Sequence, residues 1–224
     1  MRFTEIYYKA GSEKFYAPSL QAEINPEDVK FTYIGRTSLY RKIKNGKVVM
    51  TDEHRFFKNG DKVLVLQDGK NVIRELVWDD NTKEDLKDRD FKYTLVLYGV
   101  TTAGIPVKFV LSGMGIGNAF ETFSRIKPQD GAVPIVKVTG TRKFRAKLKY
   151  KGPVFTLEYE NRDLTPKESE VLQYYNEKFP YESSEMTGSG KQLQPGEAAK
   201  LLFGQGQVNN NEPNNEEEDE DLPF

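Results

Sequence analysis

The densest group of positive charges in the chain lies between residues 137 and 151. Seven cations occur in this stretch without a single acid among them: Lys137, Arg142, Lys143, Arg145, Lys147, Lys149 and Lys151. From residue 143 onward they alternate with apolar residues, Tyr150 included, so a strand would show five cations on one face and an apolar side on the other. Because such a row of cations repels itself, the pattern favours a polyanion as partner, with the cations neutralising the phosphates of a nucleic acid. The alternative interpretation is a solvated edge strand whose lysines prevent aggregation.

Several aromatic residues lie beside cations, as expected where the bases of a nucleic acid stack on side chains. The candidates are Tyr40 with Arg41, Lys42 and Lys44; Phe56 and Phe57, between Arg55 and Lys58; and Trp78. Aromatic residues in such positions more often belong to a core, and alternation does not decide between the two roles. Trp78 is followed by Asp79 and Asp80, which would repel a phosphate.

The printed sequence finishes in an acidic run closed by three apolar residues. The run Glu216-Glu217-Glu218-Asp219-Glu220-Asp221 precedes Leu222-Pro223-Phe224. Solubility explains the acids but not the apolar end. A terminal Phe beside a free carboxylate suits an apolar pocket flanked by Arg or Lys on a partner protein, and Pro223 lowers the ordering cost of binding.

This ending closely resembles the acidic tip of bacterial and phage single-stranded DNA-binding proteins, which finish in several acids followed by Asp-Ile-Pro-Phe or Asp-Leu-Pro-Phe. Asp221-Leu222-Pro223-Phe224 matches that tip residue for residue, and a stretch rich in Gln, Gly and Asn precedes it. The resemblance covers about nine residues and the style of the linker, and the body shows no family motif. It implies a divergent, phage-encoded member of the family, with an OB-fold core and a tip, Asp219–Phe224, that recruits replication and repair enzymes.

Residues that could support catalysis form no recognisable set. The run Ser112-Gly113-Met114-Gly115-Ile116-Gly117-Asn118 lacks both the Lys-Ser/Thr of a Walker A loop and the third Gly of a dinucleotide fingerprint. We interpret it as a tight turn between a strand and a helix, and the alternative is that its amides hold a DNA phosphate. His54, the single histidine, is interpreted as a surface residue, and the acids of 79–80 and 84–88 as loops. With no Cys and one His, we expect no catalytic residues, no metal site and no cofactor.

The elements that carry these residues are mostly strands, because short apolar runs alternate with turn dipeptides over residues 1–160. Asn45-Gly46 predicts a hairpin within 40–50, Asp68-Gly69 predicts one between 62–67 and 71–78, and a turn with Gly104 joins 93–100 to 107–112. Further strands are expected at 135–139, 141–150 and 154–160, which makes eight or nine in all.

Two helices are expected. Asn118 and Glu121 resemble a capping box, and apolar residues follow at helical spacing until Pro128. Thr165-Pro166-x-Glu168 is a second capping box with Pro at the first helical position. The buried face of this helix is predicted to contain Val171, Leu172, Tyr175 and Phe179. The expected fold is therefore mainly β: an OB-fold-like barrel elaborated with extra strands and one or two short helices.

The charge distribution divides the chain into three parts: a β-rich DNA-binding body (1–180), a flexible low-complexity linker (181–211) and an acidic tip (212–224). The tip carries seven of the 34 acids and no base, which leaves 27 acids against 33 bases, or +6, in residues 1–211. The low-complexity stretch 182–215, roughly 34 residues, reaches about 30 Å, so the acids are able to occupy the basic surface and compete with DNA. One apolar segment interrupts the linker, Ala198-Ala199-Lys200-Leu201-Leu202-Phe203, either as a docking segment or without consequence.

The leading hypothesis is a non-enzymatic protein that binds single-stranded DNA without sequence preference in replication, recombination or repair. The main alternative is an adaptor that uses the same tip to capture or block replication enzymes without binding DNA. A third is a nucleotide-binding enzyme built on Gly113–Gly117. The sequence shows no membrane-spanning run and no signal peptide, so we expect no membrane partner and a location in the cytoplasm of a bacterial or infected host cell.

Overall fold

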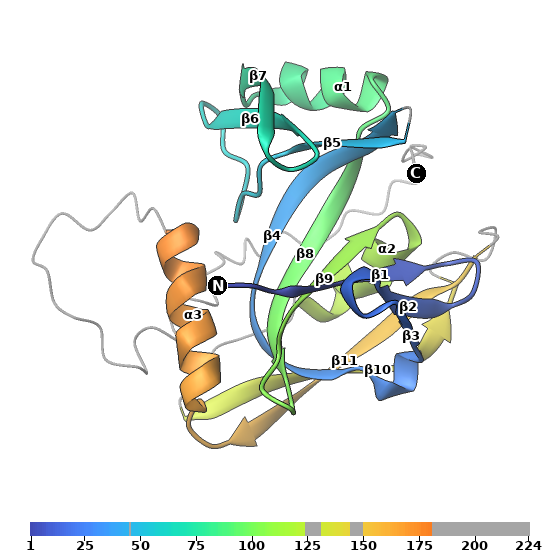
Figure 1. The fold of residues 1–224 in the computed structure, drawn as a ribbon, viewed down its shortest axis with the longest axis vertical. Helices are drawn as coiled ribbons and strands as arrows, with labels where there is room; N and C mark the ends of the chain where they lie inside the picture. Colours follow the sequence, from blue (N-terminus) through green and yellow to red (C-terminus); the bar gives the residue numbers. More distant parts are fainter. Residues whose placement is uncertain (45, 124–130, 144–149, 181–224) are drawn as a thin grey trace, which may run out of the picture.

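The computed structural model describes residues 1–180, apart from residues 45, 124–130 and 144–149 (Figure 1). The described residues form eleven strands: β1 (Thr4–Lys9), β2 (Lys14–Ala17), β3 (Ala22–Ile24), β4 (Lys30–Lys44), β5 (Lys47–Thr51), β6 (Lys62–Gln67), β7 (Asn71–Val77), β8 (Lys92–Thr101), β9 (Pro106–Ser112), β10 (Ala132–Arg142) and β11 (Gly152–Asn161). They also form α1 (Asp80–Asp88), α2 (Met114–Phe123), α3 (Pro166–Lys178) and the short 3-10 helices η1 (Pro18–Leu20) and η2 (Pro26–Asp28). The expectation of a mainly β fold is confirmed. Within the described ranges, no helix has the length and apolarity that a membrane crossing requires.

β4, the longest strand, organises a single forked sheet. Along one edge it pairs with β8 from Phe31 to Arg41. Along the other edge it pairs with β10 near Phe31 and with β5 from Arg41 onward. The strand order is therefore β3-β2-β1-β9-β8-β4-β5-β6-β7, with β10 and β11 branching from β4. Among the described residues β11 pairs only with β10 and β3 only with β2, so the sheet is open and the expected OB-fold barrel is not confirmed.

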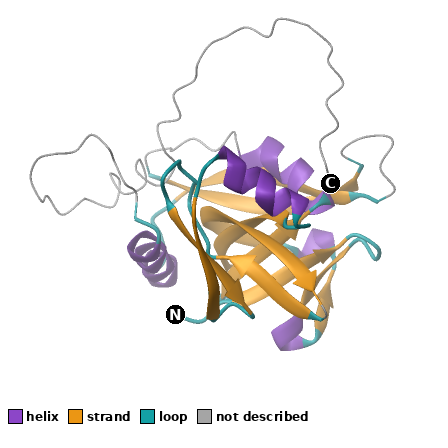
Figure 2. Cartoon of the chain, turned by 90° about the horizontal axis from the view of Figure 1, so that it is seen from above, coloured by secondary structure: helices purple, strands orange, loops and turns teal. Residues whose placement is uncertain are grey.

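The fork divides the molecule into two parts that share β4 (Figure 1). We call β5, β6, β7 and α1, with the end of β4, the lobe, and we call the remainder the body. One face of the body sheet buries Phe31 and Phe109 in a core that α2 joins, and the opposite face buries Tyr98 against Tyr175 of α3. The lobe has a separate core around Trp78, next to α1. Figure 2 shows the strands between helices that lie at the periphery.

All three hairpins predicted from turn residues are present. Lys44 pairs with Lys47 around the Asn45-Gly46 turn, and Gly46 has a φ of 75°. The β6–β7 turn contains Asp68 and Gly69, with φ values of 53° and 70°. Because a positive φ is costly for most residues, these dipeptides fix the turns and thereby the register of the strands on either side.

The predicted break between strands at 135–139 and 141–150 is wrong, and residues 144–149 of the second strand lie outside the described residues. β10 is one strand from Ala132 to Arg142, with a register shift between Val138 and Thr141. Gly140, the residue between the two predicted strands, has a φ of 135° and lies in this bulge. It bends the strand without ending it. Lys143, Tyr150 and Lys151 lie outside any strand, and Tyr150 is 44% exposed rather than inward-facing.

The helix at 165–180 is confirmed, and the other two differ from expectation. At α3, Thr165 and Glu168 form both bonds of the capping box. α2 begins at Met114, so Asn118 is not its cap; the buried amide of Asn118 instead donates to the carbonyls of Arg142 and Gly152. The acids interpreted as loops belong to α1, whose N-cap Asp79 accepts from the amide of Thr82 at 2.6 Å.

Candidate nucleic-acid interface

The described members of the predicted basic row mostly have partners already. Lys137 pairs with Glu158 at 2.5 Å, and Lys151 pairs with Glu13 at 3.2 Å. Arg142 donates to the side-chain oxygen of Asn118 at 3.3 Å. Lys143 is exposed, whereas Arg145, Lys147 and Lys149 lie outside the described residues. The structure therefore places Lys137 in the middle of β10, Arg142 at the end of that strand, and Lys143 and Lys151 in the connection to β11.

Most of the predicted stacking residues are core residues of the lobe. Tyr40 is 4% exposed and Trp78 is 6% exposed, and the Trp78 ring stacks on Phe57 with centroids 4.2 Å apart. The prediction that Tyr40 and Trp78 offer a face to bases is therefore wrong, because alternation along β4 turns Tyr40 toward α1 and the lobe core. Phe56, in contrast, is 51% exposed.

The predicted cations beside Tyr40 separate to the two faces of β4. Lys42 donates to the carbonyl of Arg89 at 2.9 Å and lies 4.4 Å from the centre of the Phe91 ring, on the side of the lobe core. Lys44 ends the strand, and its side chain lies outside the described set. Arg41 projects to the opposite face, toward β1.

A second set of residues, which the sequence analysis does not select, shares this face with Arg41. In β1, Ile6 is buried in the core, so Glu5, Tyr7 and Lys9 point the other way. Burial of Phe15 in β2 directs Tyr16 to the same side. The register aligns these strands into one row across the sheet, Glu23, Tyr16, Tyr7, Val110 and Val96, from β3 to β8.

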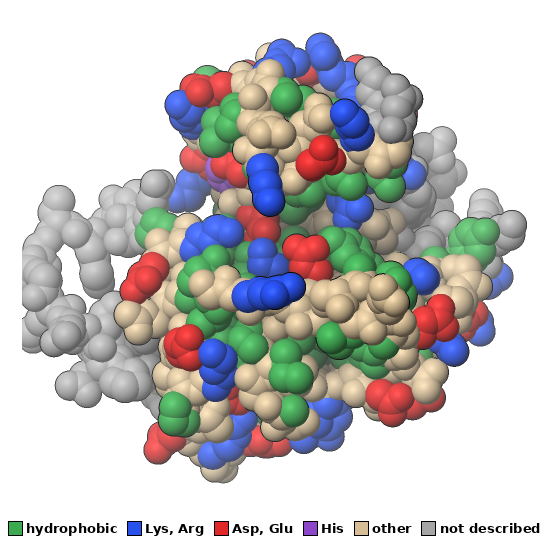
Figure 3. All heavy atoms as spheres, in the orientation of Figure 1, with side chains coloured by type: hydrophobic (Ala, Val, Ile, Leu, Met, Phe, Trp, Pro, Cys, Tyr) green, Lys and Arg blue, Asp and Glu red, His purple; other side chains and the backbone are tan. Residues whose placement is uncertain are grey.

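Two tyrosine–cation contacts mark this face, which we call the concave face. The Arg41 guanidinium lies 5.5 Å from the centre of the Tyr7 ring, and the Lys9 ammonium lies 3.7 Å from the centre of the Tyr16 ring. β9 and β8 separate β1 from β4 in the sheet, so the Arg41–Tyr7 contact spans the face from one side to the other. Figure 3 shows the surface hollowed between the lobe and the body.

The Tyr7 hydroxyl is held in place and stays protonated at neutral pH. It donates to a Glu5 carboxylate oxygen at 2.6 Å. Burial and the neighbouring Glu5 carboxylate raise the pKa of Tyr7 to about 12. The ring therefore presents a neutral aromatic surface beside a cation.

The floor of the concave face contains a buried ion pair. Lys108 of β9 pairs with Glu53 at 2.9 Å, and their side chains are 12% and 18% exposed. Glu53 also accepts from the hydroxyls of Thr37, at 2.9 Å, and Tyr98. Burial alone would raise the pKa of Glu53, but the charge of Lys108 and these hydrogen bonds outweigh it and hold the pKa below its ordinary value. The charges of Lys108 and Glu53 therefore balance each other within the floor.

The concave face brings aromatic rings and cations together on one surface. Aromatic rings with adjacent cations stack bases and neutralise phosphates without reading sequence. The described ranges contain no cluster of three or more His, Asp or Glu that would hold a metal ion. His54 is half-buried rather than on the surface: its ring bonds Asp52 at 3.0 Å and packs against Phe57.

The glycine-rich run is a strand-to-helix turn, as interpreted from its sequence. β9 ends at Ser112, Gly113 adopts a φ of 53°, and α2 begins at Met114. Gly115 and Gly117 lie inside α2, so they do not form an open loop around a phosphate.

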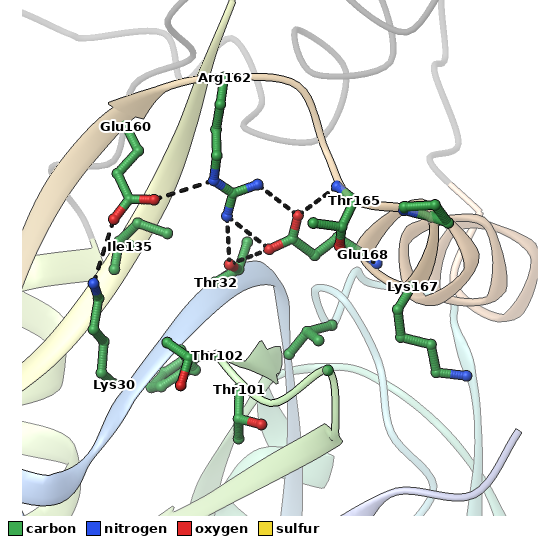
Figure 4. A pocket seen from close by; sticks show the side chains of 14 residues that line it. Lys30, Thr32, Thr101, Thr102, Ile135, Glu160, Arg162, Thr165, Lys167 and Glu168 are labelled. Atoms are coloured by element: carbon green, nitrogen blue, oxygen red, sulfur yellow. Dashed lines mark hydrogen bonds and ion pairs between the residues drawn. The ribbon is translucent and has the colours of Figure 1, made fainter.

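A separate recess of about 510 Å³ lies at the start of α3 (Figure 4). Four of its charged side chains pair with one another, and the fifth, Lys167, pairs with Glu170 outside the recess. Arg162 donates to both oxygens of Glu168, at 2.7 and 2.8 Å, and to Glu160 at 3.1 Å. Lys30 pairs with Glu160 at 3.3 Å. This network joins β4, β11 and α3, and we interpret its role as structural: it attaches α3 to the sheet.

Comparisons of the chain with protein-family models, with curated proteins and with solved structures gave no significant match.

Proposed function

We propose that this chain is a non-enzymatic protein that binds single-stranded DNA without sequence preference and recruits replication, recombination or repair enzymes through its C-terminal tip. The observation that carries the proposal is the sequence Asp221-Leu222-Pro223-Phe224 behind a run of acids, which resembles the tip of single-stranded DNA-binding proteins. The concave face supports it, because Tyr7 and Tyr16 lie beside Arg41 and Lys9 on one surface.

The finer statements on fold and origin belong to the same proposal. We infer that the body is an elaborated OB-like fold, since the body strands of the main sheet and the β10–β11 pair surround one core. This core includes Phe31, Phe109 and Phe155. A divergent, phage-encoded member of the family, acting in the cytoplasm of a bacterial or infected cell, agrees with the tip.

A binding titration tests the proposal against its alternatives. The full chain is titrated into fluorescently labelled oligo-dT, duplex DNA and ATP, and anisotropy is recorded. Preferential binding of oligo-dT supports the proposal. Binding to none of the three ligands favours an adaptor that acts through its tip alone, and binding to ATP alone favours a nucleotide-binding enzyme.

Variants on two surfaces then locate the DNA. Base stacking on a side chain contributes about 1–3 kcal/mol, so Tyr16→Ala or Tyr7→Ala is expected to weaken oligo-dT binding by about tenfold. Tyr159→Ala, half-buried on β11, is the matched control.

The triple reversal of Arg145, Lys147 and Lys149 to Glu tests the second surface. If that row contacts the backbone, the reversal flattens the salt dependence by about 0.7 per lost phosphate contact. Normal affinity in both arms would exclude both surfaces.

A further inference from the structure

The lobe has one covered and one uncovered sheet face. Val63, Val65 and Leu76 point into the lobe core beside α1. Cross-strand partners share a face, so the pairs Met50–Leu66, Leu66–Val72 and Lys62–Val77 lie on the opposite side. This second side, which we call the lobe face, is formed by Ile43, Val48, Met50, Leu64, Leu66, Val72 and Val77.

The lobe face is apolar and exposed. Ile43 is 68% exposed, Val72 is 57% exposed and Val77 is 63% exposed. Of the charged groups on this side of the sheet, Lys62 and Glu75 pair with each other at 2.8 Å. Arg41, the cross-strand partner of Met50, lies where the lobe face meets the concave face. Large aliphatic side chains gathered on one sheet face indicate a surface that packs against another apolar group. Aliphatic residues offer bases no aromatic stacking, so a peptide suits this surface better than DNA.

The lobe face continues an interface that already exists in the fold. Met50 lies at the end of the lobe face that is nearest the body. It packs against the core cluster that holds Val171, Leu172 and Tyr175 of α3. Near the C-terminal end of α3, Asn176 accepts from Arg55, which follows β5, at 3.1 Å. The chain therefore leaves α3, after Phe179, beside the lobe (Figure 1).

The first strongly apolar segment after that point is Ala198-Ala199-Lys200-Leu201-Leu202-Phe203. The 17 residues of 181–197 separate it from Pro180, and a polar chain of that length spans about 21–25 Å. Tethering at such a length gives an effective concentration on the order of millimolar, so a weak apolar contact is enough to hold the segment.

We propose that residues 198–203 dock on the lobe face of the same molecule. The contact extends the apolar cluster around α3 across Met50 to Val72 and Val77, and it fixes the point from which the acidic tip departs. The proposal does not depend on DNA binding by the concave face.

Cysteine cross-linking tests it, since the chain contains no native cysteine. Glu75→Cys lies on the lobe face and Lys200→Cys lies in the segment, and both changes keep the apolar residues. Disulfide formation in the full chain is expected to be at least about tenfold faster for this pair than for Ser19→Cys with Lys200→Cys, because docking raises the local concentration. Ser19 is exposed in η1, in the body.

Two further variants make the result decisive. Glu75→Cys with Gln207→Cys, in the polar stretch after the segment, is expected to react more slowly than the pair with Lys200→Cys. Replacing Leu201, Leu202 and Phe203 by Ser is expected to reduce the rate of the Glu75–Lys200 pair to that of the Ser19 control. Equal rates for all pairs would overturn the proposal, as would cross-links formed only between two molecules, which would assign the lobe face to a second copy.

Discussion

The carboxylate of Glu168 illustrates how single residues attach α3 to the sheet. Its side chain is 5% exposed and accepts from the Arg162 guanidinium, from the Thr32 hydroxyl and from the amide of Thr165 at 2.7 Å. Burying a charge is costly unless its hydrogen bonds are made, and here they are made by β4, by the β11–α3 connection and by the start of α3 (Figure 4). The capping box thus also serves as a tertiary contact.

We expect Glu168→Gln to destabilise the protein by about 2 kcal/mol, because the change leaves the Arg162 charge without its buried partner. Urea unfolding measures the loss. Glu170→Gln is the control, since the Lys167–Glu170 pair is solvent-exposed, and its effect should stay within about 0.5 kcal/mol. Similar losses in the two variants would show that the network does not hold α3.

The same residue makes stability depend on pH in the acid range. Burial alone would raise the pKa of Glu168, but its bonds to Arg162, Thr32 and Thr165 outweigh burial and lower the pKa from 4.5 to about 2. Because the folded-state pKa is the lower one, this stabilisation is complete above about pH 5 and declines as the pH falls toward 2. The free energy of unfolding should therefore fall more between pH 5 and pH 3 in the wild type than in Glu168→Gln. Parallel declines would contradict this assignment.

At the scale of elements, α3 packs on β4 where a glycine makes room for a tyrosine. A side chain at Gly35 would overlap with the ring of Tyr175, whose hydroxyl donates to the carbonyl of Arg36 at 2.5 Å. The irregularity between Tyr33 and Gly35 in the β4–β8 register lies at the same point. The helix and the bulge therefore depend on each other.

Gly35→Ala is expected to cost about 1–3 kcal/mol, because the extra methyl group displaces the Tyr175 ring. Relative to the wild type, amide hydrogen exchange in Gly35→Ala should become faster in α3 and stay unchanged in β6 and β7. Gly11→Ala is the matched control, since no atom lies within 4 Å of the methyl group it would add. Unchanged protection of α3 in Gly35→Ala would mean that the helix is held elsewhere.

Elements fixed by local chemistry could be predicted from the sequence, and elements fixed by distant contacts could not. The turn at Asp68-Gly69 and the capping box at Thr165 depend on neighbouring residues, and both are present. α1 buries only Leu86, so no apolar stripe reveals it. The apparent cap at Asn118 is instead a buried amide that bonds the carbonyls of Arg142 and Gly152, where β10 ends and β11 begins.

The candidate site follows the same division. Arg41 is identified from its sequence neighbours, but its partner Tyr7 is more than thirty residues away. Alternation in residues 4–9 and 14–17 does indicate that Tyr7 and Tyr16 share a face with Lys9 and oppose the core. Sequence alone does not supply the parallel pairing of β1 with β9 that brings this face next to Lys108.

At the scale of the whole molecule, most of the chain carries net positive charge and the short C-terminal segment carries net negative charge. Residues 1–211 carry +6, and residues 212–224 carry seven acids. A tether with a reach of about 30 Å allows the acids to approach cations on the surface of the same molecule. In the proposed function, the acidic tip and the phosphates of DNA compete for those cations.

Deleting residues 212–224 should therefore tighten binding of oligo-dT at low salt, by about threefold to tenfold, because a tethered competitor is removed. The gain should vanish as salt rises, since the screening length falls from about 10 Å at 0.1 M to about 3 Å at 1 M. Deleting Leu222–Phe224 alone keeps all seven acids, so it should leave DNA affinity unchanged while removing the apolar residues that the proposed function assigns to partner enzymes. Anisotropy titrations of the three chains at several salt concentrations measure these effects. The same affinity for the full chain and the chain ending at residue 211 in low salt would show that the acids do not compete with DNA, and a gain that persists at high salt would show that the competition is not electrostatic.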